Sequence, residues 1–137
     1  MDIRDSLDLI LSDTTHEFSS RFYKNLFSHH PDIIRKFEGI DLKHQGTMVI
    51  MALKVAVDHR SRPYPAVQNY LRILGHKHYL RGIHKSDYLH FETSLLTTLG
   101  AFHGSGWSPA LASDWKMAFQ RATQLMAEGH VDDFSVA

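Results

Sequence analysis

Apolar residues recur along most of the chain at intervals of three and four positions, which places their side chains on one face of an α-helix. The clearest run, from Phe18 to Phe27, predicts a helix over about residues 15–28. No segment alternates strictly between apolar and polar residues over more than four positions, as a half-buried strand would. We therefore predict an all-α fold of six to seven helices.

Prolines, glycines and capping residues divide this pattern into segments. Pro65 suits the first position of a helix and Gly82 its end, and Ser108 followed by Pro109 suits the start of the last helix. The resulting boundaries predict helices over about residues 3–11, 15–28, 42–59, 65–81, 87–102 and 108–128, and a short helical turn at 32–36.

The amino-acid composition excludes several classes of function for this chain. The chain has 137 residues, 15 of them basic and 15 acidic, so its formal charge of zero gives no electrostatic basis for binding nucleic acid or an anionic membrane. The absence of cysteine excludes disulfides, thiolate catalysis and thiolate metal sites. Because no apolar run approaches the ~18 residues of a membrane span and the N-terminus does not resemble a signal peptide, we expect one soluble domain in the cytoplasm.

His78 is the candidate ligand of a cofactor. It continues the apolar stripe of Val67, Leu71 and Leu74, so its imidazole would face the interior, where it must pair with a protein group or bind something. A hydrogen-bonded core histidine is the alternative interpretation. His76 is the neighbouring candidate, but it lies about 200° around the same helix and cannot face the same pocket.

Several motifs follow one another in a characteristic order. They are the FYKNLF run at residues 22–27 followed by His30 and Pro31, Phe37 before a loop, the Lys77-His78 pair, the spacing from Gly82-Ile83 to Tyr88, and Trp115 near the start of the last helix. In this order they resemble the globins, and among globins the bacterial single-domain haemoglobins and the haem domain of flavohaemoglobins. The resemblance covers almost the whole chain. It implies a globin domain over residues 1–130 around a haem pocket, with residues 131–137 as a C-terminal tail or the start of a linker.

The resemblance implies that haem b is the cofactor and that His78 is the proximal ligand of its iron, which leaves the sixth position open for a small gas. Leu74 would pack under the porphyrin and Phe37 would stack on it. Tyr88 stands at the spacing expected of a residue that hydrogen-bonds the proximal histidine.

On the distal side, the resemblance places Tyr23 and Gln45, whose phenol and amide would donate hydrogen bonds to bound dioxygen. A shift of the alignment by one residue would place His44 there instead of Gln45. Met48 and Val49 share the inward face of the same helix, with Val49 beside the ligand.

One position departs from the flavohaemoglobin pattern. There, a glutamate joins the tyrosine next to the proximal histidine and increases its electron donation. Counted from Trp115, the matching position holds His130, and Glu128 lies two residues earlier. Which of the two completes the proximal network stays open. The remaining histidines, His59 and His103 among them, are predicted to lie on the surface.

The function implied by the resemblance is reversible binding of dioxygen, carbon monoxide and nitric oxide, as in oxygen transport. We expect a ligand-binding protein rather than an enzyme, because nitric oxide dioxygenation would need electrons from a separate reductase. The alternative is a gas-sensor domain fused to an output domain of a larger signalling protein. A globin-fold protein without haem is a third interpretation, and a monomer and a homodimer are equally compatible with the sequence.

Overall fold

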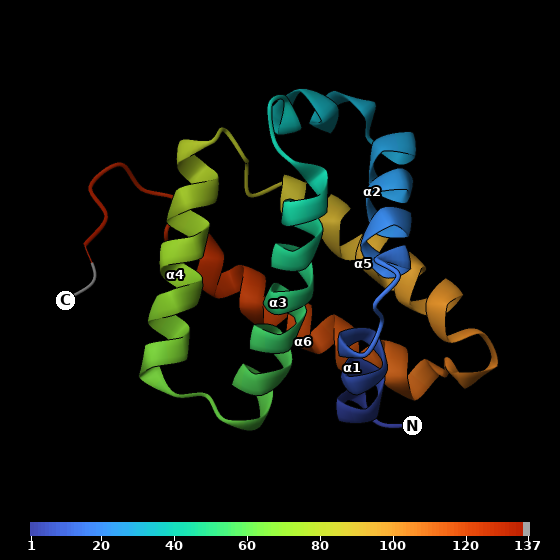
Figure 1. Ribbon diagram of the computed structural model, residues 1–137. Helices are drawn as coiled ribbons and strands as arrows, with labels where there is room; N and C mark the ends of the chain where they lie inside the picture. Colours follow the sequence, from blue (N-terminus) through green and yellow to red (C-terminus); the bar gives the residue numbers. More distant parts are fainter. Residues whose placement is uncertain (136–137) are drawn as a thin grey trace.

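The computed structural model describes residues 1–135 and contains six α-helices and two short 3-10 segments (Figure 1). The elements are α1 (Ile3–Leu11), α2 (Glu17–His29), η1 (Pro31–Phe37), α3 (Leu42–Ser61), α4 (Pro65–Leu80), α5 (Asp87–His103), η2 (Gly104–Gly106) and α6 (Pro109–Ala127). No strand occurs in the described part of the chain. The predicted all-α fold is confirmed. Of the predicted tail or linker, residues 136 and 137 lie outside the described residues.

Local side-chain chemistry explains where several helices begin and end. The carboxylate of Asp41 accepts a hydrogen bond from the backbone N–H of Lys43, and the hydroxyl of Ser108 accepts one from Leu111, so both residues cap helix N-termini. Pro65 begins α4, where a missing N–H has no cost. Gly82, with φ of 85°, follows the end of α4 in a conformation that favours glycine.

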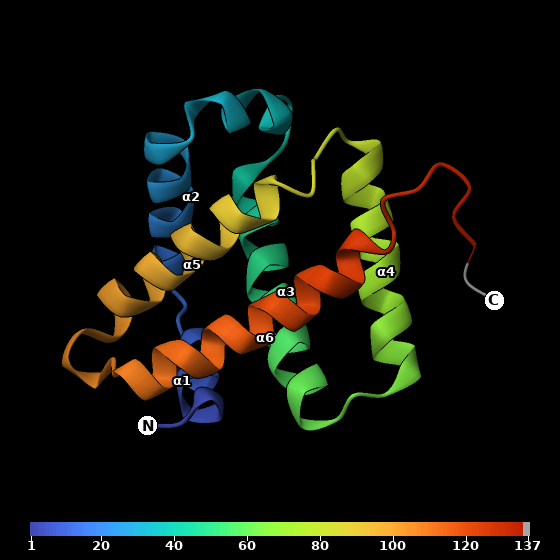
Figure 2. The ribbon, with the colours of Figure 1, turned by 180° about the vertical axis from the view of Figure 1, so that it is seen from behind.

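The helices form two crossed layers. Figure 1 shows α4, α3 and α2 side by side in front, and Figure 2, seen from the opposite side, shows α5 and α6 crossing in front of them. The most extensive contacts join α4 to α6, α2 to α5 and α3 to α6. No helix of residues 1–135 is both long enough and apolar enough to cross a membrane.

Trp115 of α6 forms the centre of the main core. It is fully buried, and its ring packs on Phe119 with centroids 5.4 Å apart. Its indole N–H donates to the hydroxyl of Ser6 at 3.0 Å, and the same hydroxyl lies 2.5 Å from Nε2 of His103. A polar chain therefore joins α1, α5 and α6 inside the apolar core, with each polar atom paired.

Two glycines allow α4 to approach the end of α6 very closely. A Cβ atom at Gly75 would lie 1.8 Å from the carbonyl oxygen of Met126, and one at Gly129 would lie 2.1 Å from the carbonyl oxygen of Arg72. Both distances are far below van der Waals contact, so only glycine fits. This contact sets the position of α4, and hence of His78, against the rest of the fold.

Three predicted side-chain positions are wrong. Met48 is 40% exposed, because the buried residue in this part of α3 is Gly46, which packs against Ser19 of α2. His59, expected on the surface, is buried with its ring next to Gln68. His103 is half-buried, as a member of the polar chain in the core.

We predict that Gly75→Ala destabilises the chain by about 3 kcal/mol, because the new methyl group meets a backbone carbonyl that cannot move without separating α4 from α6. Urea unfolding measures the loss. The matched control is Gly100→Ala in α5, where the methyl group would lie 3.3 Å from the Trp107 ring and the change should stay within about 1 kcal/mol. Equal effects of the two substitutions would contradict the close contact.

Candidate functional site

The side chains predicted to surround a ligand come from five elements. Tyr23 lies on α2, Phe37 ends η1, Gln45 and Val49 lie on the first half of α3, Leu74 and His78 on the second half of α4, and Tyr88 near the start of α5. The structure divides these residues into two groups. One group gathers around Tyr23 and the other around His78.

The Tyr23 group contains an aromatic cluster. The ring of Phe37 lies 5.6 Å from that of Tyr23 and 5.4 Å from that of Phe27, each in an edge-on arrangement. Phe37 and Val49 are half-buried and pack against this cluster. Edge-on aromatic packing holds the rings in place, so the tyrosine is set in a rigid apolar wall.

The hydroxyl of Tyr23 is buried without a hydrogen-bond partner. Tyr23 is 5% exposed, and its oxygen is the one buried side-chain polar atom in residues 1–135 that has no partner. Burial raises the pKa of Tyr23 well above its usual range, and the nearby Gln45 amide offsets this only in part. An unpaired buried hydroxyl costs about 1–3 kcal/mol. The hydroxyl, with the Gln45 amide beside it, is therefore available to a further hydrogen-bond partner.

Of the two distal candidates on α3, the structure places Gln45 next to Tyr23. Gln45 is half-buried and is the polar neighbour of the tyrosine hydroxyl, whereas His44 is exposed. The two residues are adjacent on a helix, so their side chains point about 100° apart.

His78 forms the centre of the second group. Its ring is half-buried, and burial, with lesser effects from His130 and Arg81, lowers the pKa of the imidazole to about 4. The imidazole is therefore neutral at pH 7, the form that binds metal ions. Its Nδ1 lies 3.5 Å from the hydroxyl of Tyr88, and its Nε2 forms no hydrogen bond within the described residues.

His76 faces another part of the molecule. Its Nδ1 lies 3.0 Å from the carbonyl oxygen of Gly129, and its ring stacks on Phe134 at 4.8 Å. Both contacts are with the C-terminal segment that follows α6. His76 therefore holds this segment and does not compete with His78 for the pocket.

His130 occupies the position next to Tyr88 that the sequence left open between two residues. The Tyr88 hydroxyl lies 2.6 Å from Nε2 of His130. Glu128 is exposed and pairs instead with Arg72 at 2.5 Å. Burial, followed by the neighbouring Lys85, lowers the pKa of His130. The group next to Tyr88 is thus an imidazole, not a carboxylate.

A partly buried ion pair positions the turn that carries Tyr88. Lys36 of η1 donates to Asp87 at 2.6 Å, and the same carboxylate accepts a hydrogen bond from the backbone N–H of His84 at 2.8 Å. Burial alone would raise the pKa of Asp87, but these two hydrogen bonds outweigh it and lower the pKa. The pair was not anticipated from the sequence, because Lys36 and Asp87 are far apart along the chain.

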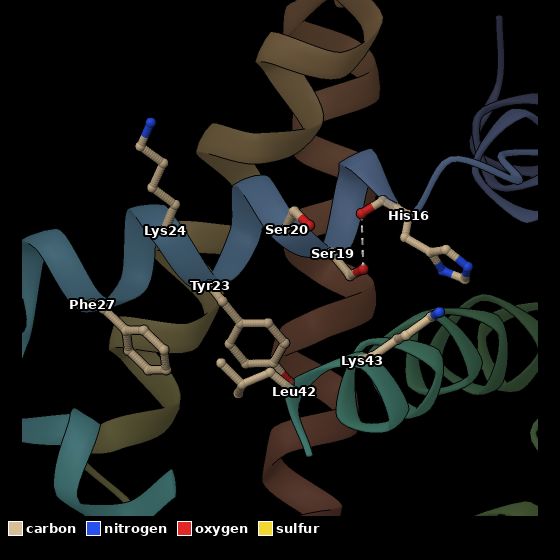
Figure 3. A pocket seen from close by; sticks show the side chains of 8 residues that line it. All are labelled: His16, Ser19, Ser20, Tyr23, Lys24, Phe27, Leu42 and Lys43. Atoms are coloured by element: carbon tan, nitrogen blue, oxygen red, sulfur yellow. Dashed lines mark hydrogen bonds between the residues drawn. The ribbon is translucent and has the colours of Figure 1, made fainter. Parts of the chain in front are cut away.

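A cavity of about 490 Å³ lies beside Tyr23, between α2 and the start of α3. Figure 3 shows Tyr23 and Leu42 projecting toward this space, while Lys24 points away from it. The lining residues are His16, Ser19, Ser20, Tyr23, Lys24, Phe27, Leu42 and Lys43. Leu42 is 41% exposed, an apolar side chain at the cavity that the sequence analysis did not identify.

The two groups have the side-chain chemistry that the two sides of a haem require. One side offers a neutral imidazole whose Nε2 is free to bind iron, and the other offers an unpaired phenol beside an amide. Phe37, Val49 and Leu74 supply half-buried apolar surface near them. Residues 1–135 contain no cluster of three or more histidine or acidic side chains able to hold a metal ion by themselves.

Comparison with known proteins agrees with this geometry. The protein-family model described as Globin matches residues 20–126, which is most of the chain and includes every candidate site residue except Glu128 and His130. A comparison with curated proteins gives no match.

We predict that Tyr23→Phe leaves the haem-free chain as stable as the parent or stabilises it by about 1 kcal/mol, because the substitution removes an unpaired buried hydroxyl. Tyr88→Phe is the matched control, since its hydroxyl is paired with His130, and we expect it to destabilise by about 1 kcal/mol. Urea unfolding of both variants provides the comparison. A large loss in Tyr23→Phe would mean that the hydroxyl has a structural partner.

The low pKa of His78 predicts that the haem-free chain loses stability on acidification. The unfolded chain binds a proton at His78 near pH 6.5 and the folded chain only near pH 4, so the free energy of unfolding falls as the pH falls between these values. Between pH 7.5 and pH 5, protonation of this residue should lower the free energy of unfolding by about 2 kcal/mol. His78→Gln should show a loss smaller by this amount in urea unfolding at the two pH values. An identical pH dependence of the two proteins would disprove the prediction.

Proposed function

Because the chain belongs to the globin family, we propose that it binds haem b through His78 and reversibly binds dioxygen and related diatomic gases on the side of Tyr23. The observation that carries this proposal is the buried, unpaired hydroxyl of Tyr23 beside Gln45. Evolution removes such groups from cores unless they have a use, because each one lowers stability. A polar diatomic ligand would supply the missing partner.

The proposed roles follow from the two groups of side chains. When bound, haem supplies an iron with one open coordination position for the gas. His78 would hold the iron through Nε2 and would keep its own ring proton on Nδ1, toward Tyr88. Tyr23 and Gln45 would offer hydrogen-bond donors to a bound gas, and Phe37 and Val49 would keep water away from it.

The form of the cofactor is limited by composition. The chain contains no cysteine, so it lacks the thiols through which c-type haem is attached. We therefore propose a haem held by the bond to His78 and by apolar contacts, as haem b is.

We propose ligand binding, rather than catalysis, as the main activity. Nitric oxide dioxygenation requires that the iron be reduced after each turnover, and nothing in these 137 residues resembles a flavin or nicotinamide site. Detoxification of nitric oxide would thus need electrons from a reductase outside these 137 residues.

Gas sensing is the second candidate function, and one observation favours it. The segment after α6 contacts α4 at three places: Gly129 with His76, Asp132 with Tyr79, and Phe134 with His76. A movement of α4 on ligand binding would therefore displace this segment as well. The coding sequence beyond Ala137 discriminates between the candidates, since a following kinase or cyclase domain would favour sensing.

We predict that the purified protein shows the absorption spectrum of a histidine-ligated haem in its ferric, dithionite-reduced, carbon monoxide and oxygen forms. His78→Gly should lose this spectrum and regain it with added imidazole. Tyr23→Phe should release oxygen roughly ten to a hundred times faster, as expected for the loss of one hydrogen bond to a partly charged ligand.

The matched control is Tyr79→Phe, which removes a hydroxyl that contacts Asp132 on the outside of α4 and should leave oxygen release unchanged. Failure to take up haem would disprove the function. An unchanged spectrum in His78→Gly would disprove the assignment of the ligand.

A further inference from the structure

An uninterrupted line of three polar side chains runs from α4 to the segment after α6. Nδ1 of His78 lies 3.5 Å from the hydroxyl of Tyr88, and this hydroxyl lies 2.6 Å from Nε2 of His130. Tyr88 is 6% exposed, while the rings of His78 and His130 are half-buried. The contact of Tyr88 with His130 is short and that with His78 is at the outer limit of a hydrogen bond, so Tyr88 is the one side chain of the described residues that could connect the two imidazoles.

We propose that His130 is a positioning residue that acts through Tyr88 to set how strongly His78 donates electrons to a haem iron. The inference rests on the proposed haem binding, which it extends to a residue outside the matched globin region. His130 does not touch the gas or the iron. Its effect is on the strength of one hydrogen bond.

The chemistry of the three groups gives each hydrogen bond a direction. Binding of iron at Nε2 of His78 leaves the ring proton on Nδ1, which must donate to the oxygen of Tyr88. The hydroxyl of Tyr88 then has its own proton to donate, and Nε2 of His130 accepts it at 2.6 Å. The proton of the His130 ring is thereby placed on Nδ1.

An imidazole as the last acceptor makes the line weaker than a carboxylate would. The pKa of His130 is lowered by burial and by nearby Lys85, His84 and His76, so the ring is neutral at pH 7. A neutral acceptor forms a weaker hydrogen bond with the Tyr88 hydroxyl than an anionic acceptor would. The Tyr88 oxygen therefore carries less negative charge and accepts a weaker hydrogen bond from His78. His78 should therefore remain closer to a neutral imidazole than to an imidazolate.

A backbone hydrogen bond from His130 to the carbonyl oxygen of Ala127, 3.1 Å long, and tertiary contacts together hold His130 in place. It follows the end of α6, and the preceding Gly129 is pressed against α4, where its carbonyl oxygen lies 3.0 Å from Nδ1 of His76. The ring of Tyr79 lies 5.5 Å from that of His130 on the other side. The same contacts leave Glu128 outside, paired with Arg72.

The test is resonance Raman spectroscopy of the dithionite-reduced haem protein, in which the frequency of the iron–histidine stretch reports the basicity of His78. We expect His130→Phe to lower this frequency and His130→Glu to raise it relative to the parent, with His130→Gln, a neutral acceptor, close to the parent. The midpoint potential of the ferric/ferrous couple should rise in His130→Phe and fall in His130→Glu. His90→Phe, on the outer side of α5 where His90 stacks on His30, is the matched control and should change neither.

A second set of variants tests whether Tyr88 transmits the effect. Tyr88→Phe alone and Tyr88→Phe combined with His130→Glu should show the same iron–histidine stretching frequency, because the connecting hydroxyl is missing. A residual difference, or an order of frequencies that does not follow acceptor strength, would overturn the proposal. If the proposal is overturned in this way but all variants still take up haem with a normal histidine-ligated spectrum, the proposed function stands.

Discussion

The close contact between α4 and α6 is the constraint on which the rest of the structure depends. At Gly75 and Gly129 the backbones of the two segments meet without side chains between them. This contact fixes the rotation of α4 about its own axis. As a result, His78 faces Tyr88 and His76 faces the C-terminal segment.

The site combines groups that are fully paired with groups that are not. The ion pair of Lys36 and Asp87 and the hydrogen bonds of the Ser6 hydroxyl satisfy their buried polar atoms within the chain. The hydroxyl of Tyr23 and Nε2 of His78 stay without partners among the described residues. The unpaired atoms are concentrated in the proposed site, which is what separates a binding site from a well-packed core.

Much of the fold could be predicted because the local signals agree with one another. Pro65, Gly82 and Ser108 mark helix ends by their own backbone and capping chemistry, and His78 follows the apolar period of its helix. Other features depend on tertiary contacts. Met48 is exposed because α3 packs through Gly46, and His59 is buried because Gln68 lies beside it. The choice between Glu128 and His130 could not be made by counting residues per turn, because α6 ends at Ala127 and His130 lies beyond the C-cap, Glu128.

The ion pair between Lys36 and Asp87 has a consequence for how this protein can diverge. Lys36 directly precedes Phe37, and Asp87 directly precedes Tyr88, so one electrostatic contact links the wall around Tyr23 to the network around His78. Loss of Lys36 would leave the buried carboxylate of Asp87 uncompensated, and loss of Asp87 would leave a partly buried ammonium group without its partner. Positions 36 and 87 should therefore covary among close homologues, and the two sides of the pocket should evolve as one unit rather than as separate surfaces.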